Sequence, residues 1–217
     1  MRPLTEAAPK ALLRVAGRAL LDRAIDAARA GGARRIVVNA HAFADQIAAH
    51  AAGLDGVVLS HETPEVLETG GGVLRALPLL GSDPFLALNA DSIWTGAEPC
   101  PPLAAAWRDG MDALLLLARR EQARNYTRPG DFFLDADGRP RRRGASPTAP
   151  FVYTGAQMLR PAALADAPEG PFSMNLIWDR AAARGRLFAV VHHGGWVDVG
   201  TPAGLADAEA ALAEAGG

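Results

Sequence analysis

Apolar residues along the chain follow two spacings, one typical of amphipathic helices and the other of buried strands. Within Leu20–Ala30 they recur every three to four positions, and Gly31 and Gly32 end the pattern, which predicts a helix. Short apolar runs predict strands at residues 35–39, 56–60, 84–91 and 112–117. Helical spacing between these runs predicts helices at residues 44–51, 72–80 and 102–108.

Strands that are apolar on both faces and separated by helices predict a parallel sheet covered on two sides. After Arg119 the pattern changes, because Phe132–Leu134, an Asp137-Gly138 turn and a basic run at residues 139–143 predict a hairpin. Further strands are predicted at 151–159 and 187–192, and helices at 173–184 and 201–215. We therefore predict one α/β domain over residues 1–217, with a more antiparallel second half.

Composition narrows the class of protein. The chain has 217 residues, 49% of them hydrophobic, and a formal net charge of −2, which fits a globular domain and argues against a nucleic-acid partner. No apolar run reaches the roughly 20 residues that span a bilayer, and the N-terminus lacks the apolar core of a secretory signal. A single cysteine, Cys100, excludes an internal disulfide. We expect a cytoplasmic protein with no membrane partner.

Polar residues follow three of the predicted strands, at 39–41, 60–62 and 89–91. Ligands of parallel α/β sheets bind at the carboxyl ends of the strands, so these positions form a candidate site. Exposed strand ends are polar in most proteins, and this simpler explanation covers the first two groups better than Asn89 and Asp91. Asp91 and Asp198 could together bind one Mg²⁺, which needs few protein ligands, although Asp198 could equally serve a turn before the last helix.

Two further features suggest a phosphate-bearing ligand. Lys10 is the only lysine among 22 basic residues, and an ammonium group suits a phosphate oxygen in a tight site, although chance explains a lone lysine equally well. Residues 68–72, Glu-Thr-Gly-Gly-Gly, open a predicted helix whose N–H groups could bind an anion, but a flexible loop is the simpler explanation. The adjacent His192 and His193 point to opposite faces of a strand, so no shared metal site is expected there.

The order and spacing of these motifs resemble the sugar-phosphate nucleotidyltransferase family over nearly the whole chain. The resemblance rests on residues 1–5, 9–10, 68–72, 89–91 and 196–202. Residues 67–80 and 130–132 are similar to a compact branch that uses UTP and N-acetylmuramate 1-phosphate in peptidoglycan recycling. The family implies a Rossmann-like nucleotide-diphospho-sugar transferase fold, a three-layer α/β/α arrangement with a mixed, mainly parallel central sheet. Residues 1–118 would bind the nucleotide and residues 119–217 the sugar phosphate.

The resemblance implies that UTP and a sugar 1-phosphate react to give a UDP-sugar and pyrophosphate, with Mg²⁺ as cofactor. The attacking phosphate is already ionised near pH 7, so the reaction needs no general base. Two alternatives stay open. One is the same chemistry on another pair, such as GTP and mannose 1-phosphate. The other is a nucleotide-sugar binding module without catalysis.

The same resemblance assigns roles to individual residues. Lys10 and Asp91 would act in catalysis, and Asp91 and Asp198 would bind Mg²⁺. The nucleotide would be bound by Lys10, Glu68, Thr69, Gly70, Gly71 and Asn89. The sugar phosphate would be bound by Asp131, Thr154, Gly155 and Asn175.

The chain departs from the family pattern in two places. The family's first strand, glycine-rich loop and signature arginine would precede Met1, so we expect a sheet open at its centre and little activity from these 217 residues. A start placed too late, a shortened chain and a diverged chain that folds without this strand are all compatible with this departure. Residues 141–147 replace the family's Glu-Lys-Pro pattern, and their arginines could contact a carboxylate of the sugar or form a solvated hairpin edge.

Overall fold

The computed structural model describes Thr5 and residues 8–216, so most of the motif predicted at residues 1–5 lies outside the described residues. Its α-helices are α1 (Leu20–Ala30), α2 (Ala44–Ala51), α3 (Glu68–Leu80), α4 (Cys100–Ala106), α5 (Asn175–Ala183) and α6 (Pro202–Gly216). Short 3-10 helices are η1 (Lys10–Leu12), η2 (Arg120–Gln122) and η3 (Pro161–Leu164). None of the described helices is long and apolar enough to cross a membrane.

Within the described part of the chain, the strands form one large sheet and three small ones. Those of the large sheet are β5 (Phe85–Leu88), β7 (Ala113–Arg119), β9 (Phe132–Leu134), β10 (Pro140–Arg142), β11 (Phe151–Leu159) and β12 (Leu187–Val191). A second sheet joins β6 (Ser92–Trp94), β13 (Trp196–Asp198) and β8 (Ala123–Arg124). Two further pairs are β1 (Arg14–Val15) with β2 (Arg18–Ala19), and β3 (Ile36–Ala40) with β4 (Val57–His61).

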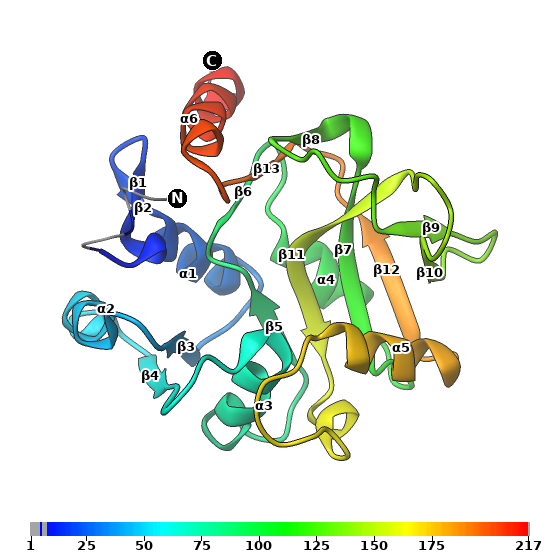
Figure 1. Cartoon of the computed structure of the whole chain (residues 1–217), viewed down its shortest axis with the longest axis horizontal. Helices are drawn as coiled ribbons and strands as arrows, with labels where there is room; N and C mark the ends of the chain where they lie inside the picture. The colour runs from blue at the N-terminus through cyan, green and yellow to red at the C-terminus, as the bar shows by residue number, and fades with distance from the viewer. Residues whose placement is uncertain (1–4, 6–7, 217) are drawn as a thin grey trace.

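Strand β11 organises the large sheet because it pairs with β5, β7 and β9, antiparallel in each case. Its two long neighbours, β5 and β7, therefore run in the same direction, and β12 is parallel to β7. The sheet is mixed, as predicted. Strands from both halves of the sequence alternate in it, since β11 and β12 flank β7 (Figure 1).

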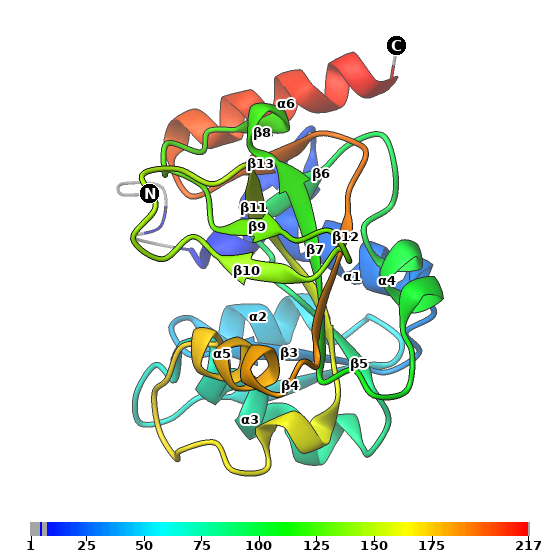
Figure 2. The same cartoon turned by 90° about the vertical axis from the view of Figure 1, so that its right-hand side faces the viewer.

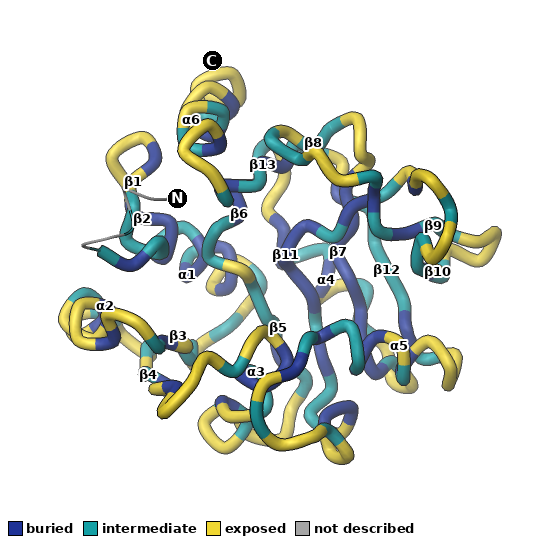
Figure 3. The backbone as a smooth tube through the Cα atoms, viewed as in Figure 1, coloured by how far each residue is buried: buried dark blue, intermediate teal, exposed yellow. Residues whose placement is uncertain are grey.

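The core of the sheet is formed by β7, whose residues 113–118 are all buried (Figure 3). Successive side chains of a strand point to opposite faces. Leu115 accordingly packs into the cluster that contains Ile177 of α5, whereas Leu114 and Leu116 pack against Leu103 of α4. Helices thus cover both faces of the sheet, which confirms the predicted three-layer fold. The apolar run of β7 is continuous because both faces of the strand are buried.

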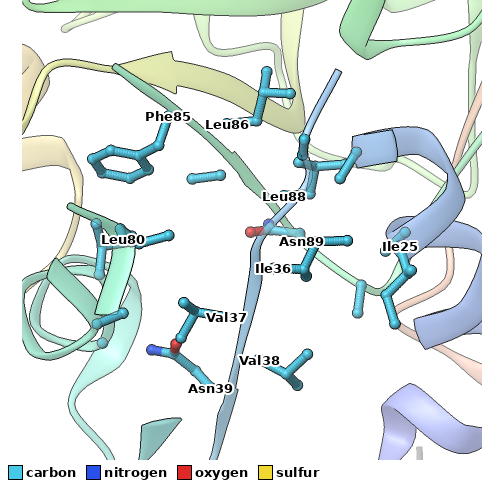
Figure 4. Close-up of a pocket in the computed structure, with 18 of the residues that line it drawn as sticks. Ile25, Ile36, Val37, Val38, Asn39, Leu80, Phe85, Leu86, Leu88 and Asn89 are labelled. Atoms are coloured by element: carbon cyan, nitrogen blue, oxygen red, sulfur yellow. The ribbon is translucent and has the colours of Figure 1, made fainter. Parts of the chain in front are cut away.

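Strands β3 and β4 pair with each other in parallel but not with the large sheet. Between β3 and β5 lies a cleft of about 790 Å³ that we call the sheet-edge cleft (Figure 4). Both strands expose an edge to it, and its walls are mainly apolar, with Ile36, Val38, Leu86 and Leu88 among the residues that line it. Among the described strands, none pairs with either of these two edges.

Helix α3 begins at Glu68, four residues earlier than the predicted helix at 72–80. Its first glycines allow close packing. A Cβ atom on Gly70 would lie 2.3 Å from the Phe172 ring, and one on Gly71 would lie 2.4 Å from the Gly170 carbonyl oxygen. The N–H groups of both glycines donate to the Phe172 carbonyl, at 2.9 and 3.3 Å. The glycines therefore dock the helix on the 170–172 segment.

We predict that Gly70→Ala lowers the free energy of unfolding by about 1–3 kcal/mol, because the added methyl overlaps the buried Phe172 ring. Gly53→Ala is the matched control, since a Cβ there has open space and its φ is not in the left-handed region. The control should change stability by less than about 1 kcal/mol. Urea denaturation measures both variants. An equal effect of the two substitutions would contradict the packing role of Gly70.

Candidate functional site

The two aspartates predicted to bind a metal lie side by side, although they are far apart in the sequence. Asp198 is the last residue of β13 and pairs with Ser92 of β6, and Asp91 immediately precedes Ser92. The backbone N–H of Val199 donates to the Asp91 carbonyl at 2.9 Å, which extends the pairing to Asp91 itself. Antiparallel pairing of β6 and β13 thus brings the two carboxylates to one end of the small sheet.

Lys10 joins this pair of aspartates. It begins η1, and its Nζ lies 2.5 Å from Asp91 Oδ2. Both side chains are partly exposed, at 29% for Lys10 and 37% for Asp91, so solvent and ligands can reach the ion pair. The structure therefore brings together the three charged residues that the sequence assigns to catalysis and metal binding.

Asp91 and Asp198 open into a cleft of about 510 Å³ that we call the carboxylate cleft. Its volume falls in the range of small-molecule sites. Of the residues predicted to bind nucleotide or sugar phosphate, five line it: Thr69, Asn89, Asp131, Gly155 and Asn175. The opposite side of the cleft is formed by the β9–β10 hairpin and the start of α5, which contribute Arg142 and Asn175.

Asp131 has both carboxylate oxygens engaged within the protein. The Tyr126 hydroxyl donates to Oδ1 at 3.0 Å, and the Tyr153 backbone N–H donates to Oδ2 at 3.0 Å. Burial, reinforced by the Asp131 charge, raises the pKa of Tyr126 to about 12, so its hydroxyl stays a donor at neutral pH. Asp131 therefore fixes the wall of the cleft and offers a ligand only its remaining lone pairs.

The neighbouring residues Thr154 and Gly155 of β11 have different environments. Gly155 lines the cleft with φ +83°, and a Cβ there would lie 2.9 Å from Asn89 Cβ. Its carbonyl accepts the Asn89 backbone N–H at 2.7 Å, so it positions Asn89. The Thr154 side chain is fully buried outside the cleft and donates to the Leu116 carbonyl at 2.9 Å, so its predicted contact with the sugar phosphate is not seen in the lining of the cleft and stays a prediction.

The predicted nucleotide-binding residues divide into two groups. Asn89 and Thr69 line both clefts, and Glu68 lines the sheet-edge cleft. Gly70 and Gly71 line neither cleft, and their N–H groups are already bonded to Phe172. Their N–H groups are therefore not free to bind an anion in this structure, and their assignment to nucleotide binding stays a prediction.

Sequence reasoning left Arg128 without a role and did not settle the role of Arg142, although both line the carboxylate cleft. Arg142 Nη1 donates to Asn175 Oδ1 at 2.6 Å, so the predicted sugar-binding residue Asn175 is held by an arginine. Arg128 stacks over the Tyr126 ring with its Cζ 4.9 Å from the ring centre. The pairing of Arg142 with Asn175 depends on a tertiary contact between residues 33 apart, and the basic run at 139–143 does not indicate it.

The donor set fits Mg²⁺ better than a transition metal. Mg²⁺ binds through one or two carboxylates and completes its shell with water and phosphate oxygens. Asp91 and Asp198 supply two carboxylates, and the Gly200 N–H orients Asp198 by donating to its Oδ1 at 2.9 Å. Among the described residues no three His, Cys, Asp or Glu side chains gather as a metal site. Substrate phosphates would have to supply the remaining ligands.

Cys100 and His192 are both buried outside the two clefts. Burial raises the pKa of the Cys100 thiol to about 12, so it remains a neutral packing group. Burial also lowers the pKa of His192. Neither side chain lines a cleft, so the structure gives no observation that assigns them a role in the site.

Comparison with known proteins gives consistent results. The family model "MobA-like NTP transferase domain" matches residues 4–215. The chain is 44% identical to N-acetylmuramate alpha-1-phosphate uridylyltransferase of Caulobacter vibrioides, over 99% of this chain and 93% of that protein. It is 32% identical to the enzyme of the same name from Neisseria meningitidis, over 97% and 92%.

Solved structures agree on the fold. A UDP-glucose pyrophosphorylase complexed with UDP-glucose superposes with a TM-score of 0.77 at 15% identity, covering 99% of this chain and 94% of that one. HddC from Yersinia pseudotuberculosis superposes with a TM-score of 0.74 at 20% identity, covering 94% and 90%. The chain belongs to the MobA-like nucleotidyltransferase family and has its Rossmann-like fold.

Proposed function

We propose that this protein is a uridylyltransferase that joins UTP and N-acetylmuramate 1-phosphate to give UDP-N-acetylmuramate and pyrophosphate. The observation that carries the proposal is that Asp91 and Asp198 line one cleft while Lys10 pairs with Asp91. The identity to the two uridylyltransferases supports the choice of substrates. We also infer a cytoplasmic location, where both phosphorylated substrates are made.

The charges of the site suit this chemistry. The reaction brings two anionic substrates together and builds charge on the α-phosphoryl group and on the departing pyrophosphate. A lysine and a divalent cation stabilise such charge, and Mg²⁺ held by Asp91 and Asp198 would supply Lewis-acid stabilisation of the phosphoryl oxygens. In the described structure Lys10 neutralises Asp91, so the ammonium already lies where phosphate oxygens have to approach.

The proposal is tested by pyrophosphate release with Mg²⁺ and N-acetylmuramate 1-phosphate, comparing UTP with GTP. Calorimetric titration of each nucleotide accompanies the assay, so that nucleotide binding is measured separately from turnover. We expect release with UTP and little with GTP. Preference for GTP would favour the guanylyltransferase alternative. Binding of UTP with no detectable release would favour the binding module.

We predict that Asp91→Asn and Asp198→Asn each reduce Mg²⁺-dependent turnover at least about 100-fold, because each removes a charged metal ligand. The readout is the rate of pyrophosphate release over a range of Mg²⁺ concentrations. Asp166→Asn is the control, since this exposed residue lies outside both clefts, and its rate should match the unaltered protein. Unchanged turnover in either of the first two variants would remove that residue from the metal site.

We predict that Lys10→Arg does not replace Lys10. The ammonium is a compact charge held against Asp91, whereas a guanidinium is broader and pairs as a planar fork. Turnover should fall about tenfold or more in Lys10→Arg, and further in Lys10→Gln, with both proteins melting within a few degrees of the unaltered one. Full activity of Lys10→Arg would show that only the charge at this position matters.

A further inference from the structure

The three consecutive arginines of the β9–β10 hairpin have different environments. Arg141 stacks over the Phe133 ring, with its Cζ 4.6 Å from the ring centre, and it lies outside the carboxylate cleft. Arg143 lines the cleft, but its guanidinium donates to the carbonyls of Gly130 and Ser146, at 3.1 and 2.6 Å. Arg142 also lines the cleft. Strand alternation explains why Arg141 and Arg142 face opposite sides.

Contacts with α5 orient the Arg142 side chain, and part of that side chain remains accessible to solvent. Its Nη1 donates to Asn175 Oδ1 at 2.6 Å, and its Nε lies 3.6 Å from Asp179 Oδ1. Its side chain remains 38% exposed. Arginine carries five N–H donors, and among the described residues Nη2 has no acceptor. The guanidinium is thus anchored through Nη1, and the residue that carries it lines the cleft with donors to spare.

Arg142 and the aspartate pair come from separate walls of the cleft. Asp91 and Asp198 belong to the β6–β13 pair, whereas Arg142 ends β10 beside α5. In Figure 1 strands β11 and β7 lie between β6 and the β9–β10 hairpin, and in the turned view of Figure 2 the hairpin lies below β13 and β6. If the reacting phosphates bind beside Lys10 and the two aspartates, Arg142 faces another part of the same sugar phosphate.

A sugar phosphate that carries a second anionic group besides its phosphate would suit the anchored Arg142 guanidinium. Its planar fork matches a carboxylate with two parallel hydrogen bonds, a geometry that a hydroxyl cannot reproduce. Arg128, stacked on Tyr126 in the same cleft, adds positive charge there. Asp179 is the opposing charge near Arg142, and at 59% exposure it is screened by water.

We propose that Arg142 determines sugar specificity by binding the carboxylate of a carboxylated sugar 1-phosphate. This inference rests on the proposed function and extends it to a residue of this chain. In N-acetylmuramate 1-phosphate the carboxylate belongs to the O-lactyl group. N-acetylglucosamine 1-phosphate has a hydroxyl at that position and is otherwise the same sugar, so the two compounds isolate the contact.

The experiment measures the affinity of both sugar phosphates by titration calorimetry in buffer with Mg²⁺, for the unaltered protein, Arg142→Gln and Arg141→Gln. We expect Arg142→Gln to weaken N-acetylmuramate 1-phosphate binding about 10- to 100-fold and to leave the other sugar phosphate within about twofold. Arg141→Gln, the matched control on the other face of the strand, should change neither affinity. Arg142→Lys keeps the charge but loses the fork, so it should recover only part of the affinity.

Thermal melting of each variant separates a binding effect from a folding effect, and Arg142→Lys keeps the test valid if Arg142→Gln is unstable. An equal loss for both sugar phosphates in Arg142→Gln or Arg142→Lys would overturn the proposal, since it would assign Arg142 to the phosphate or to the fold. Unchanged affinity for N-acetylmuramate 1-phosphate would overturn it too. If the unaltered protein binds both sugars equally, specificity by Arg142 is excluded while the proposed function stands. If it binds neither, the proposed function fails.

Discussion

The antiparallel pairing of β6 with β13 is the constraint on which the site depends. It places Asp198 opposite Ser92, and the Val199 N–H on the Asp91 carbonyl continues it to the neighbouring aspartate. Two like charges at one strand end repel each other, and a nearby cation offsets this cost. Lys10 already supplies one such cation, and a divalent ion would supply more charge. The arrangement therefore favours ligands that bring both a metal and anionic oxygens.

The strands around this pairing have different structural roles. β7 and β11 form a core buried on both faces, which gives the site a rigid base. The β9–β10 hairpin is held to β11 at its edge by the Phe151–Phe132 pair, and its arginines reach the cleft from there. At β3 and β5 the sheet is open, with backbone edges unpaired on both sides of the sheet-edge cleft. Open edges of this kind lack the hydrogen bonds that stabilise the rest of the sheet.

Local patterns could predict much of the fold from the sequence. α1, α2 and β11 have the bounds that periodicity and glycine stops predict, because apolar spacing directly reflects which face is buried. The start of α3 could not be found this way, since its glycines are set by contact with Phe172. That contact joins segments about a hundred residues apart, and no local pattern carries it.

The proximity of Asp91 and Asp198 could be predicted because both follow strand ends, whereas the candidate role of Lys10 came from its being the one lysine and from the family resemblance. The sequence does not predict the site where the direction of a residue within its strand decides whether that residue reaches the cleft. A one-residue step along β11 turns Thr154 into the core and leaves Gly155 at the cleft. Gly70 and Gly71 fit an anion-binding motif in sequence, but their N–H groups are used by the protein. Arg142 gains its role from Asn175, which belongs to a different element.

The most direct test of the account is a crystal structure of the protein grown with Mn²⁺ and UDP-N-acetylmuramate, with the metal located by its anomalous scattering. The account predicts a Mn²⁺ peak between the Asp91 and Asp198 carboxylates, bridged to the pyrophosphate of the ligand in the carboxylate cleft. A metal bound elsewhere, or a ligand whose phosphates lie away from both aspartates, would contradict the assignment of this cleft as the reaction centre.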